Sequence, residues 1–472
     1  MNSAICKPAR SFALKPLAAA VLLMYAAGIQ SAPVFQSSQG GNVTVSNPDS
    51  QTTVVTQEGS RAVANWQQFS IGANETVQFV QDNANSVILN RVTGEDISQI
   101  LGNLKANGRV FLINPNGIVF GTNAQVSVNG LVASTLSLRP EIQSNSDDIG
   151  LALNGPAASI VNNGQISAKD ILLVAPVIEN NGTLQGDGDS SKVQLIAADQ
   201  VNVNAAEGNL VFQVTEGHEN AVIHQLGTVM AEGGQIVLLA SSSAGGQPSV
   251  INVANLNQAT QIIVQGGSVR LGGDIRSAQG NTLLEVTAHH VGQENPVRVV
   301  GDIVLNSDAV ELLETQNDFA GTMTVNVNGR LDVSDSNQLQ IQGVAGHAVL
   351  SGTNVVLGDL STGHLDVNAA QLSQLHDSVV RVEGVSTLFA DSAILNQKGN
   401  QFAGVVTLDV TSQAELRSDS RFEVMGQVNN AALQSEHLVL SGLNVLGNLS
   451  LDSDTIAQTG VIDVQGSTRI QN

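Results

Sequence analysis

Phe111-Leu112-Ile113-Asn114-Pro115-Asn116-Gly117-Ile118-Val119-Phe120-Gly121 is the stretch of the sequence that decides the fold. Two short apolar runs flank a strong turn signal. Pro115 presets φ at the second position of a turn, the side chain of Asn114 can bond the backbone two residues ahead, and Gly117 suits the last position of a type I turn. The stretch therefore predicts a strand, a tight turn and a second strand.

Short strand patterns, punctuated by Gly and Asn, fill the chain from residue 40 to its end. Residues 193–196, 235–239 and 405–410 are typical, because they are brief, rich in β-branched residues and bounded by turn formers. Long helical periodicity is absent, and residues 97–104 and 369–375 alone have the spacing of a short helix. We therefore expect an all-β chain with at most two short helices.

The sequence also repeats itself. The nine residues that begin at Asn317 match the nine that begin at Asn400, 83 positions later, and residues 356–360 match residues 445–449. A period near 85 residues corresponds to about four coils of roughly 20 residues, which is within the range of solenoid units. Repetition of this kind favours a solenoid over independent domains.

The predicted fold is all-β, a right-handed parallel β-helix with an N-terminal β-rich cap. Its coils would stack at about 4.8 Å, with apolar side chains inside and inward Asn and Ser side chains in ladders. Several β-sandwich domains are the alternative, but they would not produce a steady short period.

Residues 1–32 have the pattern of a secretory signal peptide. Lys7, Arg10 and Lys15 form its basic region, and the apolar core at residues 17–27 is too short for a comfortable membrane span. Cys6 is the one cysteine of the chain and lies in this segment. The exported chain would therefore contain no disulfide and depend on core burial and backbone pairing.

Composition limits the function. The chain has 19 Lys and Arg against 41 Asp and Glu, a formal net charge of −22, which argues against nucleic acid as a partner. Trp66 and Tyr25 are the single residues of their kinds, and Tyr25 leaves with the signal peptide. Sugar-cleaving enzymes usually hold their substrates on such rings. We therefore expect no enzyme, and a β-helical polysaccharide lyase or hydrolase stays as an alternative.

Candidate metal ligands do not form a spaced set. His289 and His290 are adjacent, and the other six histidines are scattered along the chain. Metal sites need ligands spaced on one face. Residues 186–190 offer oxygen atoms of the kind that Ca²⁺ prefers, but the segment is more typical of a solvated turn. We expect no metal site and no cofactor.

The blocks around the turn resemble the secretion domain of two-partner-secretion exoproteins, the filamentous haemagglutinin family. The Asn-Pro-Asn-Gly sequence is one of the family's motifs, and the other blocks stand in the expected order over roughly residues 34 to 140. These blocks are residues 69–72, 77–80, 85–92, 97–102, 107–110 and 129–135. The chain departs from part of the family in lacking a second, earlier Asn-Pro-Asn-Leu turn.

The resemblance implies a route and a set of partners. The protein would be secreted by a Gram-negative bacterium, through the inner membrane by its signal peptide and then through a dedicated outer-membrane β-barrel transporter with periplasmic domains. It would end outside the cell or on its surface as an adhesin-like or haemagglutinin-like virulence protein, with a host-cell or bacterial surface receptor as a further partner. The delivery stalk of a contact-dependent toxin is another alternative.

The resemblance also indicates which residues serve secretion. Transporter recognition or early folding would depend on seven residues in two blocks. These residues are Asn114, Pro115, Asn116, Gly117, Asn85, Asn90 and Arg91. Arg91 is notable because positive charge is scarce, and the residues leave two interpretations open: contact with the transporter, or an ion pair with Glu95 or Asp96.

We divide the chain into three parts on these grounds. Residues 1–32 are the signal peptide, residues 33–270 the secretion domain and residues 271–472 a β-helical repeat region. The second copy of the long repeat stops short of its third, so we expect Asn472 not to be the natural end of the fold and the repeat region to be truncated.

Overall fold

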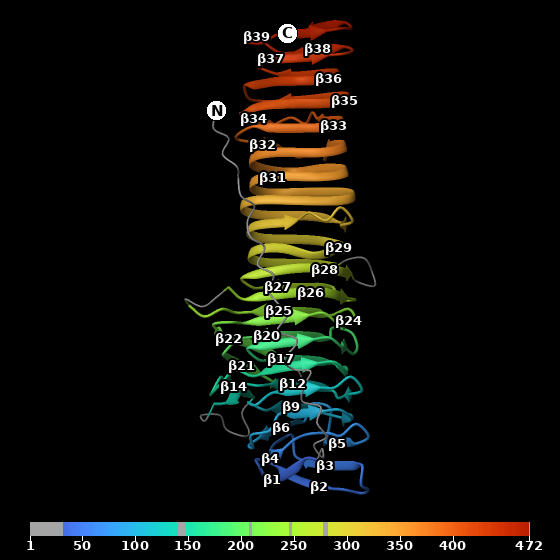
Figure 1. Ribbon diagram of the computed structural model, residues 1–472, viewed down its shortest axis with the longest axis vertical. Coiled ribbons are helices and arrows are strands. Elements are labelled where there is room, and N and C mark those ends of the chain that lie inside the picture. The colour runs from blue at the N-terminus through green and yellow to red at the C-terminus, as the bar shows by residue number, and fades with distance from the viewer. Residues whose placement is uncertain (1–31, 140–146, 207–209, 245–247, 277–281, 472) are drawn as a thin grey trace, which may run out of the picture.

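The computed structural model describes residues 32–139, 147–206, 210–244, 248–276 and 282–471. The described chain forms one upright column of stacked coils, with the N-terminal strands at one end and β38 and β39 at the other (Figure 1). It contains about 19 turns of a parallel β-solenoid, and no α-helix is found in the described ranges. The predicted all-β parallel β-helix is confirmed. All but the last residue of the predicted signal peptide lies outside the described residues.

Four strands close the N-terminal end of the column. β1 pairs antiparallel with β4, and β2 pairs antiparallel with β3. On their other edges, β3 and β4 pair in parallel with strands of the first coil. The four strands are β1 (Val34–Gln39), β2 (Asn42–Ser46), β3 (Thr52–Glu58) and β4 (Arg61–Gln68). The expected N-terminal β-rich cap is therefore present.

The next coils have three faces, each a parallel sheet of strands from successive coils. The first face contains β5 (Thr76–Val80), β8 (Asn103–Ala106), β11 (Gln125–Ser127), β16 (Gln165–Ala168), β19 (Thr183–Gly186) and β24 (Thr228–Ala231). The second contains β6 (Val87–Val92), β9 (Arg109–Ile113), β12 (Gly130–Ser134), β17 (Asp170–Val174), β20 (Lys192–Ala197), β25 (Gln235–Ala240) and β27 (Gln261–Gln265). The third contains β7 (Ser98–Ile100), β10 (Ile118–Phe120), β15 (Ser159–Asn162), β18 (Val177–Asn180), β23 (Val222–Gln225), β26 (Val250–Asn257) and β28 (Ser268–Arg276).

Beyond β28 the corners become smooth, so that single strands run over several faces. β31 alone extends over 53 residues. The strands of this part are β29 (Thr282–Leu312), β30 (Asp318–Ala320), β31 (Thr322–Gln374), β32 (Val380–Val382), β33 (Ser386–Leu395), β34 (Gln401–Phe402), β35 (Val405–Ser418), β36 (Phe422–Ser435), β37 (His437–Val445), β38 (Leu449–Asp452), β39 (Thr455–Gln458), β40 (Ile462–Val464) and β41 (Thr468–Gln471). The sheet continues without a break past residue 270.

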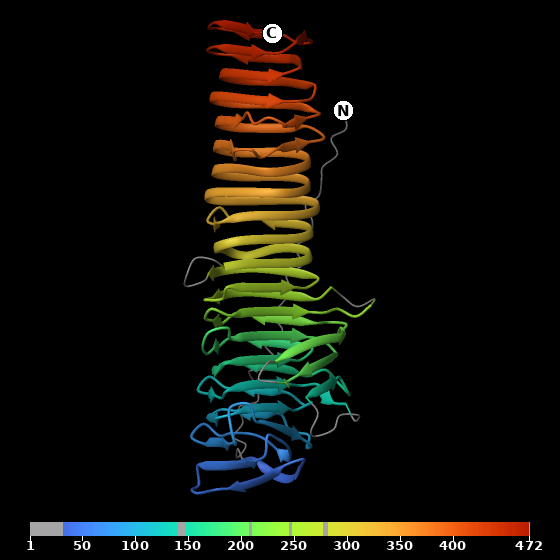
Figure 2. The ribbon, with the colours of Figure 1, turned by 180° about the vertical axis from the view of Figure 1, so that it is seen from behind.

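A small outer sheet lies against the side of the column, as the two opposite views show (Figures 1 and 2). It is antiparallel and consists of β13 (Ser137–Leu138), β14 (Asp148–Ala152), β21 (Gln200–Asn204) and β22 (Val211–Glu216). Phe111 and Leu172 project outward from the second face and pack with Leu151 and Val201 of this sheet. The second face is thus apolar on both sides, which explains its unbroken hydrophobic strands.

The interior of the column is one continuous apolar core from Val43 to Leu451. Polar side chains enter it at the corners, where they bond from coil to coil. Asn162 donates to Asn180 at 2.7 Å, and Asn180 donates to Gln225 at 2.7 Å, with all three side chains fully buried. This ladder confirms the predicted stacking of inward amides.

The long sequence repeat marks equivalent corners. The side chain of Asn317 accepts from the backbone N–H of Val297 at 2.9 Å, and that of Asn400 accepts from Val380 at 2.9 Å, each from one coil earlier. Gln293 and Gln374 complete the two corners with the same amide pairing. The register shows that the 83-residue displacement covers four coils and part of a fifth, because Asp318 pairs with Arg298 whereas Gln401 lies in the row of Arg381 and Ser361.

The same two corners differ in one residue. Asp335 accepts from the N–H of Phe319 at 2.7 Å, and Ser418 accepts from the N–H of Phe402 at 3.2 Å. Burial raises the pKa of Asp335, although its backbone hydrogen bonds oppose the shift. A charged residue and an uncharged one therefore perform the same capping role.

The two predicted short helices are wrong. Residues 97–104 form β7 and the start of β8, and residues 369–375 lie largely within β31. Ile100 and Leu104 both point inward, but from two strands on either side of a corner. A spacing of four residues fits one face of a helix, but it also fits two steps of the alternation of a strand, which here continues through the buried Gly102.

Candidate functional site

The Asn-Pro-Asn-Gly segment forms a closed turn between β9 and β10. The N–H of Gly117 donates to the carbonyl oxygen of Asn114 at 3.2 Å, and the N–H of Asn116 donates to Asn114 Oδ1 at 3.0 Å. Gly117 has a φ of 127°, which a residue with a side chain rarely adopts. The predicted strand, turn and strand are confirmed, and the last position of the turn favours glycine.

Asn114 also fastens this turn to the preceding coil. Its side chain is fully buried, and Nδ2 donates to the carbonyl oxygen of Asp96 and to Ser98 Oγ, both at 3.0 Å. Asn116 Nδ2 adds a bond of 2.8 Å to the carbonyl oxygen of Gly94. The turn is therefore held against residues 94–98 of the coil below it, and Asn114 has no free atom to offer a partner.

Asn90 is likewise a structural residue. It is fully buried, accepts from Trp66 Nε1 at 2.9 Å and donates to the carbonyl oxygen of Phe111 at 3.2 Å. The Trp66 ring packs edge-on against Phe35 of the cap, at 5.3 Å between ring centroids, and against Phe69 at 5.2 Å. Asn90 thus links the cap, through the single tryptophan, to the strand that leads into the turn.

Arg91 differs from its neighbours because its side chain is exposed. It stands in register with Asn65 on one side and with Ile113, the residue before the turn, on the other. Among the described residues no ion pair joins it to Glu95 or Asp96. An uncompensated cation therefore lies beside the turn in a chain of strongly negative charge.

The structure brings some of the seven predicted residues together and separates others. Arg91, Asn114, Pro115, Asn116 and Gly117 gather at one end of the second face. Asn85 is exposed at the opposite end of β6, where its N–H donates to Asn83 Oδ1 at 2.9 Å. Asn85 therefore does not belong to the cluster around the turn.

A buried ion pair in the same face escaped sequence reasoning. Arg109 Nη2 and Asp170 Oδ2 are 3.9 Å apart, with the two side chains 1% and 6% exposed. Gly130 stands between them in register, and a Cβ there would lie 3.1 Å from Arg109 Cγ. The missing side chain lets Arg109 reach across a whole coil.

Burial dominates the electrostatics of this pair. It raises the pKa of Asp170, which Arg109 opposes, and it lowers the pKa of Arg109, which Asp170 opposes. The sequence carried little signal for this pair, because Gly130 follows Arg109 by one ordinary coil but Asp170 follows Gly130 by a coil lengthened by the strands β13 and β14.

No group of three or more His, Cys, Asp or Glu side chains is arranged to hold a metal ion within the described ranges. Those ranges also contain no helix long and apolar enough to cross a membrane.

Comparison with known proteins gives these features their context. The TPS secretion domain, the secretion domain of two-partner systems, matches residues 30–299, more than half of the chain. The chain belongs to the two-partner-secretion exoproteins. Two-partner-secretion exoproteins are, as a family, exported and either secreted or surface-exposed. A second model, described as repeats of unknown function, matches residues 345–409 and 428–472.

The curated relatives are much longer chains. The heme/hemopexin-binding protein of Haemophilus influenzae is 26% identical over 311 residues, which is 63% of this chain and 34% of that protein. The 16S rRNA endonuclease CdiA of Enterobacter cloacae is 24% identical over 416 residues, 81% of this chain and 11% of that protein. The aligned part thus spans about a third of the first relative and about a tenth of the second.

Two solved secretion domains are also similar. The HMW1 secretion domain of Haemophilus influenzae is 21% identical, with a TM-score of 0.41 over 92% of this chain and all of that domain. The filamentous haemagglutinin secretion domain is 16% identical, with a TM-score of 0.44 over 59% of this chain and all of that domain.

Proposed function

We propose that the coils around Asn114 form the platform that the outer-membrane transporter recognises, and that the remaining coils form the shaft that it exports. Arg91 supports this proposal most directly. It is an exposed arginine without an ion pair among the described residues, placed beside a turn that buried hydrogen bonds hold rigid. A fixed turn with a free cation is a suitable contact for a partner, because few other positive charges compete with it.

The seven residues then have two roles. Asn90, Asn114 and Gly117 are buried and shape the platform, whereas Pro115 and Asn116 are partly exposed and Arg91 is fully available for contact. Asn85, at the far end of β6, would contact a different part of the transporter, such as one of its periplasmic domains.

The β-helix suits export in an unfolded state. Each finished coil offers an open edge on which the next coil can pair as it emerges, so folding proceeds from one end and opposes backward movement. We assign recognition to residues 33–270, the exported shaft to residues 271–472 and the signal peptide that is removed to residues 1–32.

Outside the cell we propose an adhesin-like role with a surface receptor on a host or bacterial cell. The name of the Haemophilus relative concerns heme and hemopexin, and it supports binding of an external ligand by proteins of this type. The alignment with CdiA over 81% of the chain favours a delivery stalk as the second candidate. We propose no polysaccharide lyase or hydrolase activity, because aromatic side chains that hold sugars are scarce.

Secretion tests this proposal. The variants Arg91→Ala, Pro115→Ala and Asn116→Ala would be co-expressed with the cognate transporter, and the protein in the supernatant and in the periplasm would be quantified. We expect each variant to accumulate in the periplasm. Arg270→Ala is the matched control, because Arg270 is an exposed arginine of the same domain paired with Glu294 at 3.5 Å. Supernatant levels equal to those of the control for all three variants would exclude the recognition role.

A further inference from the structure

The outer sheet has one long free edge. Its strand order is β13, β14, β21 and β22, and the edge strand β13 has only two residues. The other edge strand, β22, has six residues and pairs with β21 and with no other described strand. In Figure 1 the strands β14, β21 and β22 succeed one another toward the C-terminal end of the column, so the free edge faces the coil of β25. The backbone groups of such an edge can accept another strand.

The sequence of β22 carries little protection against further pairing. Natural edge strands are commonly protected by lysine, proline, bulges or a very short length. Residues 211–214 are Val-Phe-Gln-Val, which stand in regular register with β21 and include no charged residue. The irregularity in the pairing and the charged residue Glu216 both lie at the other end of the strand. An edge of four uncharged residues is therefore open.

The apolar surface beneath the outer sheet continues past this edge. Outward residues of the second face become less buried from coil to coil: Leu172 is fully buried, Val237 is 8% exposed, and Ile263 is partly exposed. Leu239, in register with the fully buried Ile196, is also partly exposed. Val237, Leu239 and Ile263 extend the apolar layer under the outer sheet, and we call them the apolar shelf. The shelf lies where one more strand of the outer sheet would cover it.

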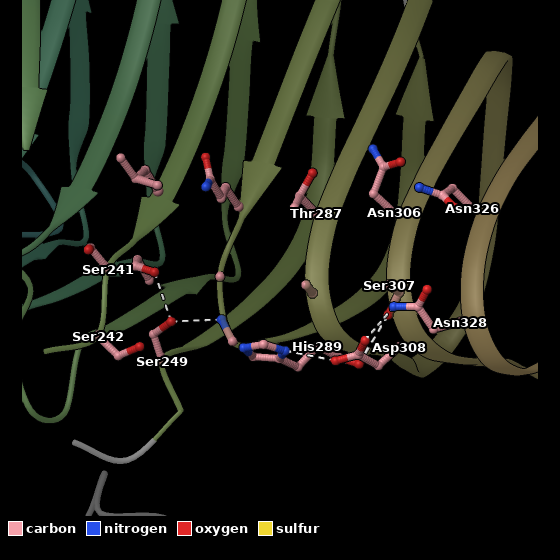
Figure 3. Close-up of a pocket in the computed structure, with 16 residues that line it drawn as sticks. Ser241, Ser242, Ser249, Thr287, His289, Asn306, Ser307, Asp308, Asn326 and Asn328 are labelled. Carbon is pink, nitrogen blue, oxygen red and sulfur yellow. Dashed lines mark hydrogen bonds and ion pairs between the residues drawn. The ribbon is translucent and has the colours of Figure 1, made fainter. Parts of the chain in front are cut away.

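A cavity of about 480 Å³ adjoins the shelf at Leu239. Ser242 lines its near side and pairs with His218, two residues after β22 ends. His289 and Asp308 line its far side, with Nδ1 and Oδ2 2.8 Å apart (Figure 3). One end of a segment laid along β22 would therefore reach this cavity, which leaves room for the side chains at that end.

Two acidic side chains border the shelf. Glu216 ends β22, and Glu285 stands in register with Ile263 on the next coil. Lys192 stands at the opposite end of this face, in register with Gln235. Together with the net charge of −22, the two glutamates favour an occupant with basic side chains over an acidic one.

A second copy of the chain does not fit this edge. Each copy carries its outer sheet flat against its own column, so pairing two such edges would place two columns beneath one continuous sheet. The column already continues past the edge, through β28 and the strands that follow it (Figures 1 and 2). The two columns would therefore occupy the same space, whereas a single extended segment meets no such obstacle.

We propose that the free edge of β22 binds an extended segment of a partner protein as a fifth strand of the outer sheet. Backbone groups of the segment pair with β22, its alternate apolar side chains cover the shelf, and its basic side chains meet Glu216 and Glu285. The proposal rests on the adhesin-like part of the proposed function, because it names the chemistry of the receptor. It involves none of the residues around Asn114.

Binding of a synthetic peptide to the purified exported protein tests this proposal. The probe is a labelled peptide of about eight residues in which valine and threonine alternate, with lysines at both ends, and fluorescence anisotropy gives its Kd. The variant Leu239→Ser/Ile263→Ser removes two apolar contacts of the shelf, and we expect it to bind about tenfold more weakly or worse. Val344→Ser is the matched control, because Val344 is an exposed apolar residue of a later coil.

Two modified peptides separate backbone pairing from apolar adsorption. Each carries N-methyl groups on alternate residues, so the first copy loses the N–H donors of one strand edge and the second copy those of the other edge. We expect at least one copy to bind about tenfold more weakly than the unmodified peptide, because a paired strand presents one edge to β22. If the double variant fails to fold, which circular dichroism and melting temperature would show, the methylated peptides decide alone.

The proposal is overturned if the unmodified peptide does not bind, if both methylated copies bind as it does, or if a folded double variant binds as the wild type does. A dimer in sedimentation that is lost in the double variant would make the occupant a second copy and also overturn it. Adherence of the wild-type protein to cells without any peptide binding would sink this inference and leave the adhesin-like role standing. We expect the double variant to reach the supernatant at wild-type levels, which separates this site from export.

Discussion

Replacing Asn114 with alanine tests whether the turn depends on one buried amide. The wild-type side chain makes four hydrogen bonds, two donated to Asp96 and Ser98 and two accepted from Asn116, at 3.0 to 3.1 Å. Each such bond contributes about 1 kcal/mol. The side-chain amide of Asn116 can turn to water, but its backbone N–H cannot, so we expect a loss of about 3 kcal/mol. The loss should be local, because coils of a solenoid contact only their neighbours.

Amide hydrogen exchange measures this local stability. We expect exchange in β9 and β10 to accelerate about a hundredfold, which corresponds to about 3 kcal/mol, while β36 and β37 remain unchanged. Asn85→Ala is the control, because Asn85 is exposed and its side chain makes no hydrogen bond to a described residue. Exchange in β9 and β10 within about threefold of wild type would refute the reasoning that Asn114 holds the turn.

Two further predictions concern buried charge. Gly130→Ala would press a methyl group against Arg109 and displace its side chain from Asp170, so we expect the free energy of unfolding to fall by about 1 to 3 kcal/mol. Urea unfolding, followed by the fluorescence of the single tryptophan, measures this loss, and an unchanged midpoint would contradict the prediction. Burial raises the pKa of Asp335, so the folded state holds this proton more tightly than the unfolded chain, and the carboxyl's contribution to stability falls as pH rises through the raised value. Asp335→Ser copies Ser418 of the later repeat, so we expect it to raise the melting temperature above that of the wild type at pH 7.5 but not below about pH 4. An equal rise in melting temperature at both pH values would exclude the buried charge of Asp335 as its cause.

The position of the turn residues was predictable, but their roles were not. Proline and glycine impose a turn between two apolar runs by local geometry alone, so residues 114–117 could be assigned directly. Asn114 and Asn90 were expected to serve recognition or early folding, and their complete burial now favours a structural role. Arg91 is exposed because it points outward from β6, between the buried residues Asn90 and Val92.

The outer sheet and the buried pair depended on tertiary structure for a related reason. The strands at residues 137–152 and 200–216 form one sheet although some 50 residues separate them, and no local pattern records which segments pair. Arg109 and Asp170 are 61 positions apart and meet because the residue between them in register is glycine. Such contacts depend on the number of residues in each intervening coil.

The sequence by itself determined the class of fold, the length of the coil and the identity of the family. Short β-branched runs, frequent turn residues and an 83-residue displacement all reflect rules that act within one coil or between equivalent coils. The tertiary structure decided what lies on the outer surface: which amides bond each other and which charged side chains find a partner. These outcomes depend on the register of side chains in neighbouring coils, because stacking at about 4.8 Å brings together residues that the chain separates by about 20 positions.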